Sequence, residues 1–182
     1  MPVTQLQSMA YASLVAALTA VGAYIHIPLG PVPIVLQNLF VLLAGLLLGS
    51  RWGAISIATY LLVGAIGLPV FSGAKGGIAH FMGPTGGYLV GFLIAAYLTG
   101  YVSELFQHRV AADIAAVTLG SITIYAVGAP WLKIITGLTW GKALTIGILP
   151  FLIGDVLKAS AAVLLARTLR HMVVRQPETA ST

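Results

Sequence analysis

The segment that decides the fold is Leu149-Pro150-Phe151-Leu152-Ile153-Gly154-Asp155-Val156-Leu157-Lys158, which continues to Ala166 with only Ala, Ser, Val and Leu. It is apolar like a membrane helix, yet it contains two full charges. Residues three apart share one face of a helix, so Asp155 and Lys158 can reach each other or a common third group. A charge inside a membrane span is costly and usually faces a cavity. The segment therefore predicts a transmembrane helix with a polar site on one face; the alternative is an ion pair that only locks two helices together.

The whole chain has the composition of a membrane protein. Of its 182 residues, 59% are hydrophobic and 7% are charged, whereas soluble domains carry about 25% charged residues. Residues 1–50, 52–74 and 76–103 contain no Asp, Glu, Lys or Arg. Uncharged apolar runs of this length predict membrane helices, which need about 20 residues each, whereas membrane strands would alternate in polarity. We predict an all-α integral membrane protein, a single domain over residues 1–182 in which six transmembrane helices form a compact bundle with irregular outer loops.

Prolines, glycines and charges separate the predicted spans. His26–Pro33 holds three prolines and a glycine within six residues, Gly49–Gly53 includes Arg51 and Trp52, and Glu104–Arg109 is charged. Residues 129–148 are predicted to be a longer loop with a short interfacial helix. We expect no cleaved signal peptide, because no Lys or Arg precedes the first apolar run. The predicted spans are 8–27, 34–49, 53–67, 88–103, 113–128 and 149–169, and the tail 176–182 is predicted to be disordered.

Leu68–Gly87 is the most irregular stretch, with seven Gly and Pro residues between Gly73 and Gly87. It is apolar enough to lie at membrane depth, where non-helical backbone survives only if protein covers it or it lines a cavity. We therefore expect it to form a pocket wall. The second span adds Gln37 and Asn38, whose amides need a partner from a neighbouring helix or a ligand.

Several classes of function lack the residues they need. The chain has no cysteine and four acidic residues, so a thiolate metal site, a Cys nucleophile and a catalytic carboxylate pair are excluded. Gly137–Ala143 is one residue short of a phosphate-binding loop and ends in Ala. No basic face interleaved with aromatic residues indicates nucleic-acid binding. Three of the four histidines lie near predicted span ends, and only His80 lies in the irregular stretch. We predict no enzyme, no cofactor and no metal, but a binding pocket. A purely structural subunit would leave Asp155 and Lys158 without a purpose.

A stripe of small residues runs along the first span, and it comprises Ser8, Ala12, Ala16 and Ala20. Such stripes let two helix backbones approach closely in lipid. The stripe either packs within the bundle or docks on another membrane subunit, and the sequence favours neither.

Charges in the connections set the expected orientation. Six spans place both termini on one side, where five arginines outnumber the three lysines of the other side, and positive charge concentrates on the cytoplasmic side. We therefore expect both termini in the cytoplasm and a pocket that opens outward, because Asp155 and Lys158 fall in the outer half of the sixth span. The arginines are Arg51, Arg109, Arg167, Arg170 and Arg175, and the lysines are Lys75, Lys133 and Lys142.

Four motifs, taken in order, resemble those of the BioY family of biotin transporters, the substrate-binding (S) components of energy-coupling factor (ECF) transporters. The similarity covers residues 8–169, and the motifs are Gly30–Asn38 (GPVPIVLQN), Gly67–Phe71 (GLPVF), Gly83–Tyr88 (GPTGGY) and Gly154–Lys158 (GDVLK). The resemblance implies a six-helix protein of a prokaryotic plasma (inner) membrane that captures biotin with high affinity. An S component for a different vitamin and a solitary biotin transporter are the closest alternatives.

The resemblance also implies partners and roles for individual residues. Ala12, Ala16 and Ala20 would dock on a transmembrane coupling (T) subunit that two ATPase subunits drive; membrane lipid and a homo-oligomer are further expected contacts. Asp155 would accept hydrogen bonds from the ureido N–H groups of biotin, and Lys158 would donate to the ureido carbonyl or the tail carboxylate. The remaining expected site residues are Gln37, Asn38, Thr85, Gly86 and Gly87 for polar contacts, with Phe71 and Tyr88 covering the rings.

Overall fold

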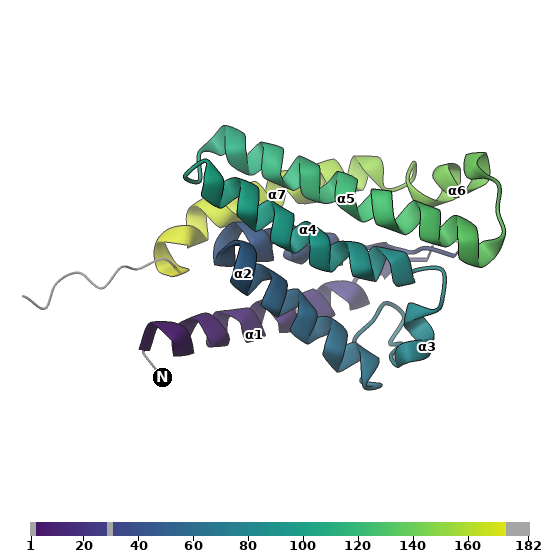
Figure 1. The fold of residues 1–182 in the computed structure, drawn as a ribbon, viewed down its shortest axis with the longest axis horizontal. Coiled ribbons are helices and arrows are strands. Elements are labelled where there is room, and N and C mark those ends of the chain that lie inside the picture. The colour runs from purple at the N-terminus through teal and green to yellow at the C-terminus, as the bar shows by residue number, and fades with distance from the viewer. Residues whose placement is uncertain (1–2, 29–30, 174–182) are drawn as a thin grey trace, which may run out of the picture.

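The computed structural model describes residues 3–28 and 31–173, and in that part of the chain the protein is a bundle of helices (Figure 1). The prediction of a predominantly helical fold is confirmed, although the described residues form seven helices and not six. The elements are α1 (Val3–Tyr24), β1 (His26–Ile27), β2 (Ile34–Val35), α2 (Gln37–Ala65), α3 (Ile78–Phe81), α4 (Gly86–Leu105), α5 (Val110–Thr136), α6 (Trp140–Gly147) and α7 (Leu152–Val173).

Several of these helices have the length and hydropathy of membrane spans. Helices α1, α2, α4 and α5 are each long and apolar enough to cross a membrane. Helices α6 and α7 meet this condition together, joined by a bend of 47°, which gives up to five spans. Pro150 lies at the bend, where its missing N–H interrupts the helical hydrogen bonds. The composition of the chain and the architecture of the bundle therefore agree on a multi-pass membrane protein.

Helix α2 reverses its direction at Gly49. This residue has φ 77° and ψ −177°, a conformation that is open mainly to glycine. A Cβ atom placed on Gly53 would lie 3.0 Å from the Cα of Gly45, although residues eight apart in a straight helix are about 12 Å apart. The two halves of α2 therefore fold back on each other. The predicted connection Gly49–Gly53 is helical apart from its first residue.

Helix α4 holds this reversal in place. Glu104 near its end accepts hydrogen bonds from the backbone N of Ser50 at 3.1 Å and from the Oγ of Ser50 at 2.7 Å. Gly100 allows the backbones to touch, because a Cβ atom there would lie 2.3 Å from the N of Ser50. The absence of a side chain at Gly100 is therefore a packing requirement.

The small residues of α1 pack inside the bundle. Ala12 and Ala16 are buried, with 4% and 7% of their surface exposed, and the backbone O of Ala12 accepts a hydrogen bond of 2.8 Å from Ser56 of α2. Packing against α2 thus accounts for their size, and Ala20 is half-buried. Helix α1 begins earlier than the predicted span 8–27. It also ends earlier, because His26 pairs with Val35 in the β1–β2 hairpin.

The prediction of a loop over residues 129–148 was wrong in its first part. Helix α5 continues to Thr136 and contains Pro130. A proline inside a helix costs about 3 kcal/mol or more, and tertiary packing offsets this cost. The side chain of Trp131 packs against α4, and its Nε1 donates to the backbone O of Gly83 at 2.9 Å. The expected short helix is α6.

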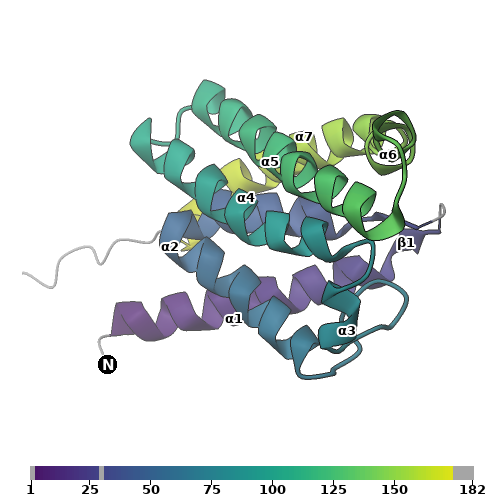
Figure 2. The same cartoon turned by 45° about the vertical axis from the view of Figure 1, so that its right-hand side comes forward.

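The two ends of the bundle carry different structures. The hairpin, α3 and α6 lie at one end, whereas the start of α1 and the last turns of α7 lie at the other (Figures 1 and 2). The described residues between α1 and α2 are not helical, as the prolines predicted, and β1 and β2 form an antiparallel pair. The tail 176–182 lies outside the described residues.

Candidate binding site

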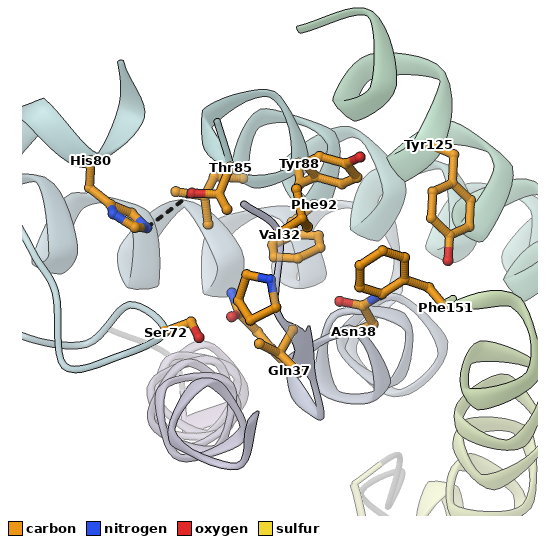
Figure 3. A pocket seen from close by; sticks show the side chains of 13 residues that line it. Val32, Gln37, Asn38, Ser72, His80, Thr85, Tyr88, Phe92, Tyr125 and Phe151 are labelled. Carbon is orange, nitrogen blue, oxygen red and sulfur yellow. Dashed lines mark hydrogen bonds between the residues drawn. The ribbon is translucent and has the colours of Figure 1, made fainter. Parts of the chain in front are cut away.

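A cavity lies inside the bundle, close to the end that carries the hairpin, α3 and α6. Its empty volume is about 510 Å³, part of it open to solvent. Apolar and aromatic walls with a few polar groups are typical of sites for small organic molecules. The residues that line it are Val32, Pro33, Val35, Gln37, Asn38, Ser72, His80, Thr85, Tyr88, Leu89, Phe92, Tyr125 and Phe151, and ten of them are labelled in Figure 3.

The first turn of α2 supplies two buried amides to the cavity wall. The Nε2 of Gln37 donates to the hydroxyl of Tyr60 at 2.9 Å, and that hydroxyl donates to the backbone O of Val70 at 3.2 Å. The Nδ2 of Asn38 donates to Asp155, at 3.2 Å from Oδ2. The Oδ1 of Asn38 is buried and has no hydrogen-bond partner. Because an unpaired buried acceptor is costly, this oxygen is suited to receive an N–H donor from a ligand.

Asp155 and Lys158 lie directly behind that wall and do not line the cavity. The two residues form an ion pair with 2.7 Å between Nζ and Oδ1, and they are 7% and 9% exposed. Asp155 also accepts hydrogen bonds from Asn38 and from the hydroxyl of Tyr125, two residues that do line the cavity. The carboxylate therefore orients Asn38 and Tyr125, so its influence reaches the cavity through their side chains.

Aromatic side chains form much of the remaining wall. Tyr88 and Phe92 project from α4, and Tyr125 comes from α5 (Figure 3). The hydroxyl of Tyr88 donates to the backbone O of Gly147 at 2.9 Å, which ties α4 to the end of α6. Phe151 closes the same side, at the bend before α7. Flat apolar surfaces of this kind are suited to cover rings and methylene chains.

The opposite end of the cavity carries His80, Ser72 and Thr85 (Figure 3). The Nε2 of His80 lies 3.2 Å from the Oγ1 of Thr85. Burial lowers the pKa of His80 below its ordinary value, and the positive charge of Lys75 lowers it further, so the ring is neutral at pH 7. The Oγ of Ser72 is buried and has no hydrogen-bond partner. This end of the cavity therefore offers a second free polar group.

Three of the residues predicted for the site support it from outside. Phe71 is fully buried and stacks on the ring of His80, with 5.0 Å between the ring centroids. Gly86 and Gly87 begin α4 and pack against Trp131, since a Cβ atom on Gly87 would lie 2.2 Å from the Cβ of Trp131. All three shape the cavity wall without lining it.

Sequence reasoning located four residues of the lining, Gln37, Asn38, Thr85 and Tyr88, and retained His80 as a candidate. It missed Tyr125, whose hydroxyl contacts Asp155, and the apolar residues Phe92 and Phe151. A tyrosine inside a predicted span was the available signal for Tyr125, because a buried hydroxyl needs a partner. Phe92 and Phe151 carry no such signal, since phenylalanine occurs both in a protein core and on a surface that faces lipid.

Comparisons with known proteins agree with this architecture. The model of the BioY family matches residues 1–175. A probable biotin transporter BioY of Pyrococcus horikoshii is 43% identical over 158 residues, which cover 87% of this chain and 93% of the relative. The biotin transporter BioY of Thermotoga maritima is 41% identical over 165 residues, covering 91% and 96% of the two chains. The crystal structure of an S-component for biotin from an ECF-type ABC transporter is similar, with a TM-score of 0.88, 34% identity and coverage of 93% of this chain and 94% of that one.

Proposed function

Because this chain belongs to the BioY family of membrane transporters, we propose that it is the biotin-binding S component of an ECF-type transporter. In this role it captures biotin at the outer side of the membrane with high affinity, and partner ATPases supply the energy for import. The protein is a transporter and not an enzyme.

The observation that carries the proposal is the unpaired Oδ1 of Asn38 in the wall of a mostly apolar and aromatic cavity. The ureido ring of biotin offers N–H donors and a carbonyl, and its fused thiophane ring is apolar. In the proposed complex, Oδ1 of Asn38 accepts from a ureido N–H, and Tyr88, Phe92 and Phe151 cover the rings. Asp155 keeps Asn38 in this orientation, because the Nδ2 of Asn38 already donates to it.

The proposed role of Asp155 and Lys158 is indirect. Since they bond to each other at 2.7 Å and lie behind the wall, they act on the ligand through Asn38 and Tyr125 in this conformation. Both charges are therefore necessary for binding, because Lys158 balances the carboxylate that orients Asn38.

The proposed topology has six spans, with the two halves of α2 counted separately and α6 and α7 counted as one. This count agrees with a chain that starts and finishes its described helices at the same end of the bundle (Figure 1). We propose that this end faces the cytoplasm, because the arginines Arg51, Arg109 and Arg170 lie near it. The cavity then opens to the outside of a prokaryotic plasma membrane.

The proposed partners are a T subunit and two ATPase subunits. Docking of the T subunit through Ala12, Ala16 and Ala20 stays a prediction. Ala12 and Ala16 are buried against α2, so this docking requires α1 to move away from α2.

The test is a binding titration of the purified chain in detergent, by calorimetry or tryptophan fluorescence, with biotin, thiamine and riboflavin. We expect tight binding of biotin and no competition by the other two vitamins. Preferential binding of thiamine or riboflavin would instead identify an S component for a different vitamin. Biotin uptake into cells that express the chain with and without the T and ATPase subunits then separates an ECF component from a solitary transporter.

A further inference from the structure

A second cavity adjoins the first and leads toward the surface at the end of the bundle that carries α3. Its empty volume is about 810 Å³, including open solvent. Four residues line both cavities, namely Pro33, Ser72, His80 and Thr85. The two spaces therefore meet at these four side chains, and together we call them the path, with an inner chamber at Asn38 and an outer vestibule at Lys75.

Lys75 gives the vestibule a positive charge. Among the described residues that line either cavity there is no other Lys or Arg, and no Asp or Glu. The ion pairs in the described part of the chain are Lys158 with Asp155 and Arg170 with Asp113, so Lys75 takes part in neither. An exposed ammonium group with no carboxylate partner at the mouth of a pocket attracts anionic groups.

The fold fixes the segment that presents Lys75. Phe71 and Lys75 exchange two backbone hydrogen bonds, of 2.9 Å from the N of Phe71 and 3.3 Å from the N of Lys75. The side chain of Phe71 is fully buried and occupies space left free by Gly64, where a Cβ atom would lie 2.0 Å from its Cζ. Phe71 thus anchors the turn, and the turn holds Lys75 beside Gly73 at the vestibule.

The polar groups along the path suit an elongated ligand with two different ends. The free acceptor of Asn38 lies in the inner chamber, and the unpaired Oγ of Ser72 lies where the two cavities meet. The ammonium of Lys158, the alternative partner for an anionic group, is already neutralised by Asp155 at 2.7 Å. Only Lys75 offers an uncompensated positive charge on this path.

We infer that Lys75 is a specificity-determining residue that recognises the carboxylate of the ligand tail in the outer vestibule, while the N–H head of the ligand lies in the inner chamber. The inference rests on the proposed function and extends it by fixing the direction in which the ligand lies. It reassigns the tail carboxylate from Lys158 to Lys75. It also makes the charge of the tail, and not only its shape, part of recognition.

The test compares biotin with biotinamide, whose tail is neutral but similar in size, on the full chain and on Lys75→Gln. For a partly solvated charge pair we expect the unchanged chain to prefer biotin by about threefold to tenfold. In Lys75→Gln the ratio of the affinity for biotin to the affinity for biotinamide should fall to about one, because only the affinity for biotin decreases. The matched control is Lys142→Gln, since Lys142 is exposed on α6 and lines neither cavity; it should keep the preference.

A second measurement needs no variant. Raising the ionic strength should weaken the binding of biotin to the unchanged chain and leave biotinamide unaffected, because exposed charge pairs are screened by salt. The inference is overturned if the unchanged chain does not distinguish the two ligands, or if Lys75→Gln keeps the full preference for biotin. Failure of the unchanged chain to bind biotin at all would overturn the proposed function instead.

Discussion

Two buried aspartates lie near opposite ends of the bundle, and they use their hydrogen bonds differently. Asp113 is fully buried, and Asp155 is 7% exposed. Each accepts hydrogen bonds from one cationic side chain and from at least one neutral side chain. One carboxylate holds helices together, whereas the other organises the wall of a cavity.

The partner of Asp113 comes from a distant part of the chain. Arg170 of α7 binds it with both terminal nitrogens, at 3.1 and 3.2 Å, and Ser103 of α4 also donates to it. The same guanidinium donates to the backbone O of Leu46 at 3.1 Å and of His108 at 3.4 Å. This cluster joins α2, α4, α5 and α7. The Nε of Arg170 lacks a partner, but Arg170 lines neither the inner chamber nor the vestibule.

The partner of Asp155 lies three residues away on the same helix, so the ion pair itself does not link α7 to another helix. The links to other helices are made by Asn38 and Tyr125, which line the cavity. One acceptor, the Oδ1 of Asn38, stays free. The two aspartates therefore differ in what their hydrogen bonds reach: those of Asp113 link distant helices, whereas those of Asp155 reach two side chains of the cavity wall, one of which keeps an unpaired oxygen.

The largest expected effect is on stability, from Asp113→Ala. Removal of the carboxylate leaves the guanidinium of Arg170, 16% exposed, without its charged partner, and breaking a buried ion pair from one side costs about 3–5 kcal/mol. We expect a strong decrease of the melting temperature in detergent, with an unchanged Kd for biotin in the folded fraction. A Kd that weakens as much as the stability would show that this cluster also serves the binding site, and the contrast between the two aspartates would fail.

Asp155→Ala should act mainly on binding, and we expect biotin affinity to fall by about 100-fold, because Asn38 loses its orientation and Lys158 keeps an unpaired charge. The double variant Asp155→Ala/Lys158→Ala is the control. It removes both charges and should recover melting temperature without recovering binding, as titration and thermal melting can check. Recovery of biotin affinity in the double variant would show that the pair is structural.

Asn38→Ala tests whether a single atom, the free Oδ1, contributes to binding. Its loss should lower the affinity for biotin by about tenfold, as expected for one lost hydrogen bond in a buried site. Asn38→Asp keeps the size but places a second carboxylate beside Asp155, so it should bind more weakly than the parent as well. Parental affinity in Asn38→Ala would remove Asn38 from the site.

The smallest effect concerns pH at the Asp113 end. Burial lowers the pKa of His108 below its ordinary value of 6.5, and the charge of Arg170 lowers it further, although Asp113 and Glu104 oppose this. The unfolded chain therefore binds the proton more readily, and the contribution of His108 to stability should be lost as the pH falls below 6.5. Melting temperatures at pH 7.5 and 5.5 should differ less in His108→Gln than in the parent. An equal difference in both would contradict this assignment.

The irregular regions were predictable where the residue type itself forbids a regular helix. The break after α1 follows from Pro28, Pro31 and Pro33, and the reversal of α2 falls at a glycine that begins a predicted connection. Pro130 shows the opposite case. It lies in the stretch that was predicted to be a loop, but α5 continues past it to Thr136, because Trp131 packs against α4.

The candidate site was predictable as a set of residue types but not as a geometry. Asp155 and Lys158 stood out because charges are rare in apolar segments, and Asn38 stood out as an amide at the same depth. That Asp155 lies behind the wall, with Asn38 and Tyr125 in front of it, depends on how α2, α5 and α7 meet.

Composition and hydropathy are local properties of the chain, so they were sufficient to predict a helical membrane protein with two charged residues inside its last span. The packing of the helices, in contrast, fixes which buried aspartate cross-links distant helices and which one contacts the side chains of a cavity wall. It also decided that Ala12 and Ala16 pack inside the bundle and that Lys75 lies at the mouth of the cavity. The physical reason is that burial and hydrogen-bond satisfaction are properties of pairs of atoms from distant segments, which hydropathy along one segment does not contain.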